Sequence, residues 1–218
     1  MNDPVKAFWR LRLQEIKEQL EANNFQAFVA ENAESARKTV LAEILPASGA
    51  RSVSYGGSMT MKAVGLYDLF TAADRRFEVI CADEPGISVE EKLERRRRAL
   101  LVDLYVSGVN ALTEKGQLVN LDMIGNRTGA ITFGPKHVLL LVGRNKIVPD
   151  IETAMLRIKN YCAPVNAMRL DCKPPCVKTS HCADCKSPGR ICNTWTITEK
   201  SFPKGRIKVV LINEDLGL

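Results

Sequence analysis

The stretch His137-Val138-Leu139-Leu140-Leu141-Val142 contains the longest uninterrupted apolar run in the sequence. Five consecutive apolar residues have the length of a strand that is buried in the core of a sheet. The run is far shorter than the roughly 18 apolar residues that a membrane-spanning helix requires. It therefore predicts a buried strand, and we expect no membrane span.

Shorter apolar segments on either side of this run alternate with helical patterns. Helices of about ten residues between strands indicate crossover connections, which favour a largely parallel sheet flanked by helices, an α/β fold. We expect a single domain over residues 1–218, with a mainly helical part at 1–50 and a Cys-rich insertion at 162–195 before the last strand. Strands are predicted at 25–29, 51–55, 77–81, 101–106, 118–121, 137–142 and 207–212, and helices at 4–22, 34–44, 59–66, 88–100 and 151–161.

Capping residues support several of these helices. Asp3 followed by Pro4 is typical of a helix start, and Ser88 with Glu91 forms a capping-box pattern. Pro46 is expected to end the second helix. The four arginines at 95–98 suit the carboxyl end of a helix, where they favour a solvated face or an anion contact over a nucleic-acid surface.

The positive charge of the chain is local. The 218 residues hold 31 Lys and Arg against 25 Asp and Glu, a net charge of +6. Residues 169–208 contain nine basic and three acidic side chains, so the rest of the sequence is balanced. The amino-terminal residues are amphipathic and charged and show no secretory signal. These features predict a cytoplasmic protein.

The same basic segment carries five of the seven cysteines, at positions 172, 176, 182, 185 and 192, among several prolines. Such a loop has little apolar surface to bury, and a metal held by thiolates would stabilise it. A Cys-x2-Cys pair with two outer cysteines can supply four ligands to a [4Fe–4S] cluster or to Zn²⁺. Disulfides and unligated thiols are the alternatives, although a reducing cytosol and an odd cysteine count disfavour a disulfide framework. A zinc-ribbon nucleic-acid module is a further alternative, disfavoured because few aromatic residues are nearby.

Two further motifs are candidates for ligand binding. A glycine-rich turn between a predicted strand and a helix exposes backbone N–H groups to an anion, with hydroxyl groups beside them, although such turns also serve tight packing. A carboxylate after a strand, beside a lysine and a glycine, is a candidate general base or nucleophile, and an Asn-Arg pair can position an anion. The candidates are Gly56, Gly57, Ser58 and Thr60 in the first motif, and Glu114, Asn126 and Arg127 in the second.

Taken in order, these motifs resemble those of the lactate-utilisation (LUD) domain family. The resemblance rests on the segments 54–60, 108–114, 125–127, 134–148 and 175–192 and covers nearly the whole chain. It implies a fold like that of the NagB, RpiA and CoA-transferase proteins. It also implies a role in oxidising L-lactate together with iron–sulfur partner subunits. The cysteines related to the family pattern are Cys176, Cys182, Cys185 and Cys192, which leaves Cys172 as a spare.

Three functions follow as hypotheses. The first is a component of lactate or 2-hydroxy acid utilisation that binds a small anionic metabolite and is linked to iron–sulfur electron transfer. The second is an enzyme similar to sugar-phosphate isomerases or CoA transferases, with Glu114 as the catalytic residue, although Lys115 stands where the transferase motif has asparagine. The third is a non-catalytic partner subunit whose basic Cys segment docks an acidic surface.

Overall fold

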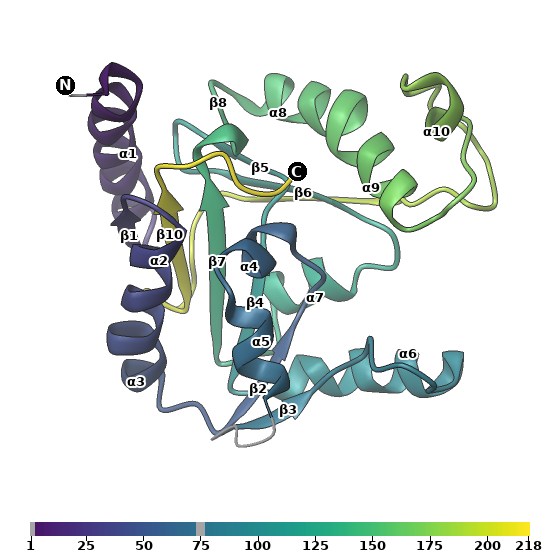
Figure 1. Cartoon of the computed structure of the whole chain (residues 1–218), viewed down its shortest axis with the longest axis horizontal. Helices are drawn as coiled ribbons and strands as arrows, with labels where there is room; N and C mark the ends of the chain where they lie inside the picture. The colour runs from purple at the N-terminus through teal and green to yellow at the C-terminus, as the bar shows by residue number, and fades with distance from the viewer. Residues whose placement is uncertain (1–2, 73–76) are drawn as a thin grey trace.

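The computed structural model of the chain describes residues 3–72 and 77–218 (Figure 1). Most of the predicted elements are present, and several differ in length or in place from the prediction. In chain order they are α1 (Pro4–Ala22), β1 (Gln26–Ala30), α2 (Ala33–Thr39), the π-helical turn η1 (Val40–Ile44), α3 (Leu45–Ser48), β2 (Ser52–Tyr55), α4 (Met59–Ala63), α5 (Leu66–Thr71), β3 (Glu78–Ile80), α6 (Val89–Arg98), the 3₁₀ turn η2 (Ala99–Leu101), β4 (Leu104–Gly108), β5 (Ala111–Thr113), β6 (Leu118–Asp122), α7 (Asn126–Thr132), β7 (His137–Gly143), the 3₁₀ turn η3 (Arg144–Lys146), β8 (Ile147–Val148), α8 (Ile151–Arg157), the π-helical turn η4 (Ile158–Cys162), α9 (Ala163–Arg169), α10 (Cys176–Thr179), β9 (Thr194–Thr198) and β10 (Ile207–Ile212).

The main sheet is parallel throughout, as predicted. Its six strands lie in the order β1-β10-β7-β4-β2-β3. The strand built from the long apolar run, β7, lies near the middle and pairs with β10 through Val138 opposite Ile207. The last strand in the sequence thus lies between β1 and β7, which closes the core of the domain.

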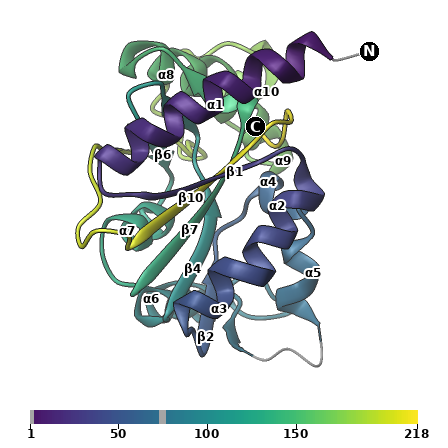
Figure 2. The same ribbon diagram turned by 90° about the vertical axis from the view of Figure 1, so that its left-hand side faces the viewer.

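Side chains of β7 alternate between two apolar layers. Leu139 and Leu141 face a layer that includes α2, α4 and α5, whereas Val138, Leu140 and Val142 face α1 and the β5–β6 hairpin. Figure 2 shows helices on both sides of the sheet. A strand buried on both faces needs an apolar residue at every position, which is why this run has no polar alternation.

A second, four-stranded sheet was not predicted. It has the order β8-β5-β6-β9 and is mixed, since β6 pairs antiparallel with both β5 and β9. The predicted strand at 118–121 therefore belongs to this smaller sheet, and the strand at 194–198 was missed. The missed strand β9 has the sequence Thr194-Trp195-Thr196-Ile197-Thr198, and its alternation of polar and apolar residues is the signal that could have found it.

The predicted helix starts are confirmed. The Asp3 side chain accepts a hydrogen bond from the Val5 N–H at 3.0 Å, and the Ser88 hydroxyl accepts one from the Glu91 N–H at 3.1 Å. Within α6, Arg95 forms ion pairs with Glu91 and Glu84. The arginine run therefore lies along a helix and pairs in part with neighbouring acids, as a solvated helix face does.

Pro46, which was expected to end the second helix, is instead accommodated within it, and Pro164 is accommodated in the same way. Pro46 follows the π-helical turn η1, and Pro164 follows the π-helical turn η4. A wider i→i+5 turn shifts the hydrogen-bond ladder, so a residue without an N–H fits one turn later. The helix predicted at 151–161 consequently continues through α9 to Arg169, and the predicted insertion at 162–195 begins inside a helix.

The predicted strand at 101–106 begins later than expected. Residues Ala99–Leu101 form the turn η2, with Leu101 exposed, and β4 runs from Leu104 to Gly108. Within the described ranges, every helix is too short or too polar to cross a lipid bilayer.

Candidate functional site

The candidate site lies at the point where the strand order of the main sheet changes direction, between β2 and β4. From β2 the chain passes through α4 and α5 to β3 on one side, and it then returns to β4 on the other side of β2. The helices after β2 and the segments after β4 pack on opposite faces of the sheet. In open α/β sheets this arrangement leaves a crevice at the carboxyl ends of the two strands, where ligands bind.

Glycines at the two strand ends keep this crevice open. A Cβ atom on Gly56, after β2, would lie 2.8 Å from the Tyr105 hydroxyl and 2.9 Å from the Ser107 hydroxyl. A Cβ atom on Gly108, at the end of β4, would lie 2.9 Å from the Ser58 hydroxyl and 3.5 Å from Lys146 Nζ. These positions therefore require glycine for steric reasons, independent of backbone angle.

A cavity of about 420 Å³ fills the crevice. This volume is within the range of small-molecule sites. Its polar lining combines hydroxyl, amide and charged groups. Those groups come from Ser54, Tyr55, Ser58, Asp83, Arg96, Tyr105, Asn110, Asp122, Asn126, Arg127, Lys146, Asn166 and Arg169.

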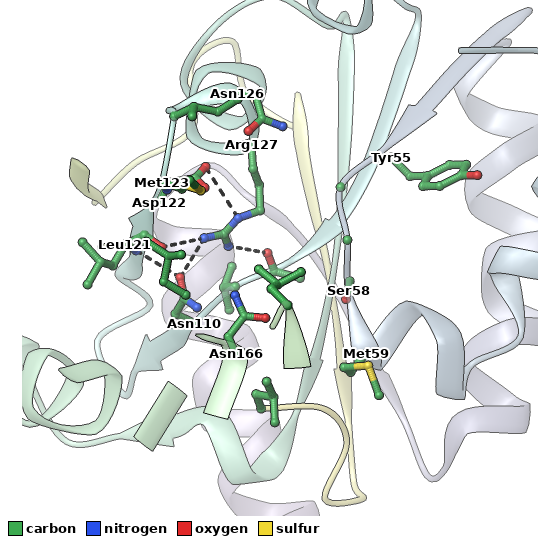
Figure 3. Close-up of a pocket in the computed structure, with 18 of the residues that line it drawn as sticks. Tyr55, Ser58, Met59, Asn110, Leu121, Asp122, Met123, Asn126, Arg127 and Asn166 are labelled. Carbon is green, nitrogen blue, oxygen red and sulfur yellow. Dashed lines mark hydrogen bonds and ion pairs between the residues drawn. The ribbon is translucent and has the colours of Figure 1, made fainter. Parts of the chain in front are cut away.

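Arg127 organises one wall of the cavity (Figure 3). Its guanidinium group donates to Asn110 Oδ1 and Asn120 Oδ1, each at 2.8 Å, and to the carbonyls of Gly108 and Leu121. Its Nε lies 3.8 Å from the Asp122 carboxylate. Because these groups engage the guanidinium so fully, Arg127 mainly fixes the positions of the asparagines and does not offer a free clamp for an anion.

The predicted residues of the glycine-rich turn line the cavity, except Thr60. Gly56, Gly57 and Ser58 line it, and so do Asn126 and Arg127 from the second motif. The Thr60 hydroxyl lies apart and donates to the Leu216 carbonyl at 3.0 Å. The Ser58 side chain caps the five-residue helix α4 by accepting from the Met61 N–H at 3.2 Å.

Glu114 does not reach this cavity. Its carboxylate forms an ion pair with Arg12 of α1, and its backbone N–H donates to the Val148 carbonyl. Glu114 is not among the residues that line the crevice. A catalytic role for Glu114 stays a prediction, and it would have to operate elsewhere on the surface.

Lys146 is one of the site residues that the sequence did not suggest, and Arg169 and Asn166 are others. Lys146 follows β7 in the turn η3, and only 4% of its surface is exposed. The pKa of its ammonium group is lowered to about 7, mainly by burial, with Arg157 and Arg127 acting in the same direction and Cys162 in the opposite one. A lysine immediately after the carboxyl end of a buried central strand is the signal that could have found it.

Two of the four cations in the cavity lining lack a carboxylate partner among the described residues. Arg96 is 3.4 Å from Asp83, and Arg127 approaches Asp122. Lys146 donates to the Val109 carbonyl at 3.2 Å, and Arg169 donates to the Asn166 side chain at 2.8 Å. The cavity therefore carries an excess of positive charge.

The cysteine segment lies apart from the core, at the upper right of Figure 1 around α10. A small second cavity is lined by Cys176, Cys182, Cys185 and Cys192, together with Ile191 and Pro164 among others. Burial raises the pKa of the Cys176 thiol, and the thiols of Cys185, Cys192 and Cys182 raise it further. The fifth cysteine of the segment, Cys172, is not part of this lining.

The four sulfurs share a cavity but do not form a compact ligand sphere. Within residues 3–72 and 77–218, no three His, Cys, Asp or Glu side chains are grouped closely enough to hold a metal ion. The loop backbone is held by Arg190, which donates to the carbonyls of Cys185 at 2.6 Å and Cys192 at 2.8 Å. The four thiols have the donor chemistry of a metal centre, and binding a metal would require them to move closer together.

Comparisons with known proteins place the chain in a family. No curated protein matches its sequence. A crystal structure of a DUF162 family protein from Deinococcus radiodurans is similar, with a TM-score of 0.47 and 16% sequence identity over 93% of this chain and 97% of that one. The sequence profile of the LUD domain matches residues 13–212, nearly the whole chain. The protein therefore belongs to the LUD domain family.

Proposed function

We propose that this protein binds a small anionic metabolite of the 2-hydroxy acid class, such as lactate, in the cavity between β2 and β4. The observation that carries the proposal is the pair of cations, Lys146 and Arg169, that line this cavity without a carboxylate partner among the described residues. Lys146 is buried and Arg169 is exposed, so the cost of an unpaired buried cation applies to Lys146, and a bound carboxylate would offset that cost. The resemblance to lactate-utilisation proteins supports the same class of ligand.

The neutral groups of the cavity suit a ligand that carries a hydroxyl beside its carboxylate. Asn126 and Asn166 offer amide donors and acceptors, and Ser58 adds a hydroxyl group. Mixed donors and acceptors of this kind distinguish a hydroxy acid from a simple carboxylate.

Isothermal titration of the full-length protein with L-lactate, D-lactate, inorganic phosphate, ribose 5-phosphate and acetyl-CoA tests this proposal. We expect lactate to bind at a single site and Arg169→Ala to weaken its binding by about tenfold, the loss expected for one charge-assisted contact. Lys173→Ala, outside the cavity lining, is the matched control and should bind as the wild type does. If phosphate or CoA esters alone bind, the isomerase- or transferase-like alternative replaces this one.

A second proposal concerns the cysteine segment. We propose that Cys176, Cys182, Cys185 and Cys192 bind a [4Fe–4S] cluster, with Zn²⁺ as the alternative, and that this centre links the protein to iron–sulfur partner subunits. The supporting observation is that these four cysteines line one cavity and Cys172 does not. A bound centre would supply either electron transfer or structural cross-linking of the loop.

Metal analysis and a visible spectrum of protein purified without oxygen test the second proposal. Iron at about four atoms per chain with a broad visible absorption indicates the cluster, and zinc at about one atom per chain indicates the structural site. Protein that contains neither metal, and takes up neither on reconstitution, would overturn it. The cavity between β2 and β4 is tested separately by the titrations above.

A further inference from the structure

The ammonium group of Lys146 has an unusual setting for a lysine. Its Nζ is buried and donates to the Val109 carbonyl at 3.2 Å, its single hydrogen bond to the described residues. On the two sides of this nitrogen lie Gly108 and Gly217, where a Cβ atom would be 3.5 Å and 3.2 Å from Nζ. Two glycines therefore leave space around an amine that lines the cavity.

The charged groups around Lys146 oppose its protonation. Arg127, on α7, and Arg157, at the end of α8, lower the pKa of Lys146, whereas the Cys162 thiol of η4 raises it. Arg157 itself donates to the Asn110 and Asn145 carbonyls, so it stays in place. With burial as the largest cause, the pKa near 7 leaves a large fraction of the amine neutral at physiological pH.

A buried neutral lysine beside other cations is the arrangement that activates an amine as a nucleophile toward carbonyl groups. Oxidation of a 2-hydroxy acid yields a 2-oxo acid, which carries a ketone next to its carboxylate. Such a molecule would offer an electrophilic carbon to Lys146 and an anion to Arg169, and both residues line the same cavity.

We propose that the ε-amine of Lys146 condenses with the ketone of a small 2-oxo acid in this cavity to form an imine. The nitrogen attacks the carbonyl carbon, a C–N bond forms, and the carbonyl oxygen departs as water after taking up the two amine protons. No electrons are transferred in this step, so it needs no oxidant or reductant. The inference rests on the proposed function, because it uses the same cavity and the oxidised form of the same class of ligand.

Trapping with sodium cyanoborohydride tests the imine directly. The full-length protein is incubated with pyruvate and the reductant, and its intact mass and peptide map are recorded. We expect one carboxyethyl group per chain, located on Lys146. L-lactate, which has no ketone, should give no adduct. Adducts spread over surface lysines, with Lys146 unmodified, would overturn the proposal.

The variant Lys146→Arg keeps the positive charge but cannot form an imine, so its trapping should fall to the level of the lactate control. Lys159→Arg, which removes a lysine outside this cavity, is the matched control and should label as the wild type does. Circular dichroism shows whether each variant folds. If Lys146→Arg does not fold, the peptide map of the wild-type protein still decides the result.

The pH dependence of trapping gives a second readout. Because the neutral amine attacks, the rate on Lys146 should rise with pH through about 7 and then level off. Labelling of an ordinary surface lysine would continue to rise toward its pKa of about 10.4. A rate on Lys146 that rises only above pH 9 would contradict the proposed activation.

Binding measurements separate the two proposals. If pyruvate binds by isothermal titration but no adduct is trapped, the imine is excluded and the anion-binding function stands. If neither lactate nor pyruvate binds and no adduct forms, both proposals fail.

Discussion

The cavity between β2 and β4 and the cysteine segment of residues 172–192 differ in what holds their side chains in place. The cavity is bounded by strands buried on both faces, and Arg127 alone ties it to four groups of the surrounding chain. In the cysteine segment, α10 has no buried residue, and Ile191 is the main apolar side chain turned inward. The first region is preorganised by packing, whereas packing holds the second region only weakly.

Backbone conformation shows the same contrast. Of the four described non-glycine residues with positive φ, three are in or next to the cysteine segment, namely Asp171, Ser180 and Asp184. Such conformations cost about 1 kcal/mol or more for residues other than glycine. A segment that accepts this cost with little apolar burial requires another source of stability, and the four thiols offer one through metal binding.

The largest expected effect comes from the four cysteines that we propose as metal ligands. The double variant Cys176→Ser, Cys185→Ser should lose nearly all bound iron or zinc, because two of the four thiolates are removed. Cys172→Ser, outside the small cavity, should retain it. Metal analysis of the three proteins prepared together measures this. Equal metal content in all three would show that the quartet is not the binding site.

A methyl group added at Gly56, in the wall of the cavity, should also lower the stability of the protein clearly. Gly56→Ala places a Cβ atom 2.8 Å from the Tyr105 hydroxyl and is expected to lower the free energy of unfolding by about 1–3 kcal/mol. Lactate binding should weaken with it. At Gly57, the next residue, the nearest atom would be 3.9 Å away, so Gly57→Ala should fold as stably as the wild type. Urea denaturation compares the two, and equal losses would contradict a rigid cavity wall.

The strands that carry the cavity are also joined at their opposite ends, by Asp103. Its carboxylate accepts from the Arg51 and Ser52 N–H groups and pairs with Lys136 at 2.8 Å. The Lys136 ammonium and then these backbone donors hold the pKa of Asp103 far below its usual range. Asp103→Asn should therefore lower the free energy of unfolding at pH 7 by about 1–2 kcal/mol.

The sign of the pH dependence follows from that lowered pKa. The stabilisation by Asp103 is complete above the unfolded-state pKa of about 3.9, and it is lost as the pH falls through the lower folded-state value. Denaturation curves of the wild type and Asp103→Asn should consequently converge below pH 4. A difference that stays constant down to pH 2 would indicate that the ionised carboxylate contributes nothing.

Arg190→Lys, in the cysteine segment, is expected to change the free energy of unfolding least. Lysine cannot span the carbonyls of Cys185 and Cys192 as the arginine does. The segment should open more often, so its thiols should be alkylated faster than in the wild type. The free energy of unfolding should change by less than about 0.5 kcal/mol. A large loss of global stability would show that the segment is part of the core.

Much of the fold was predictable because its elements are local. The apolar run at 137–142 indicated a strand buried on both faces, and Asp3 and Ser88 indicated helix starts, since capping and periodicity involve neighbouring residues. The ordered motifs indicated the LUD family, and the profile match over 13–212 confirms it. Pro46 was misjudged, because the π-helical turn that accommodates it has no clear sequence signal.

The site was predictable only in part. Gly56, Gly57, Ser58, Asn126 and Arg127 were expected at a ligand site, and they do line one cavity. Glu114, expected beside them, pairs with Arg12 instead, and Lys146 was overlooked in what resembles a charged turn. The sequence by itself determined which segments form the six strands of the main sheet and which residues carry reactive groups. Only the tertiary structure decided which of those groups share a cavity, because that depends on the strand order that places β2 beside β4 and on the packing that buries Lys146.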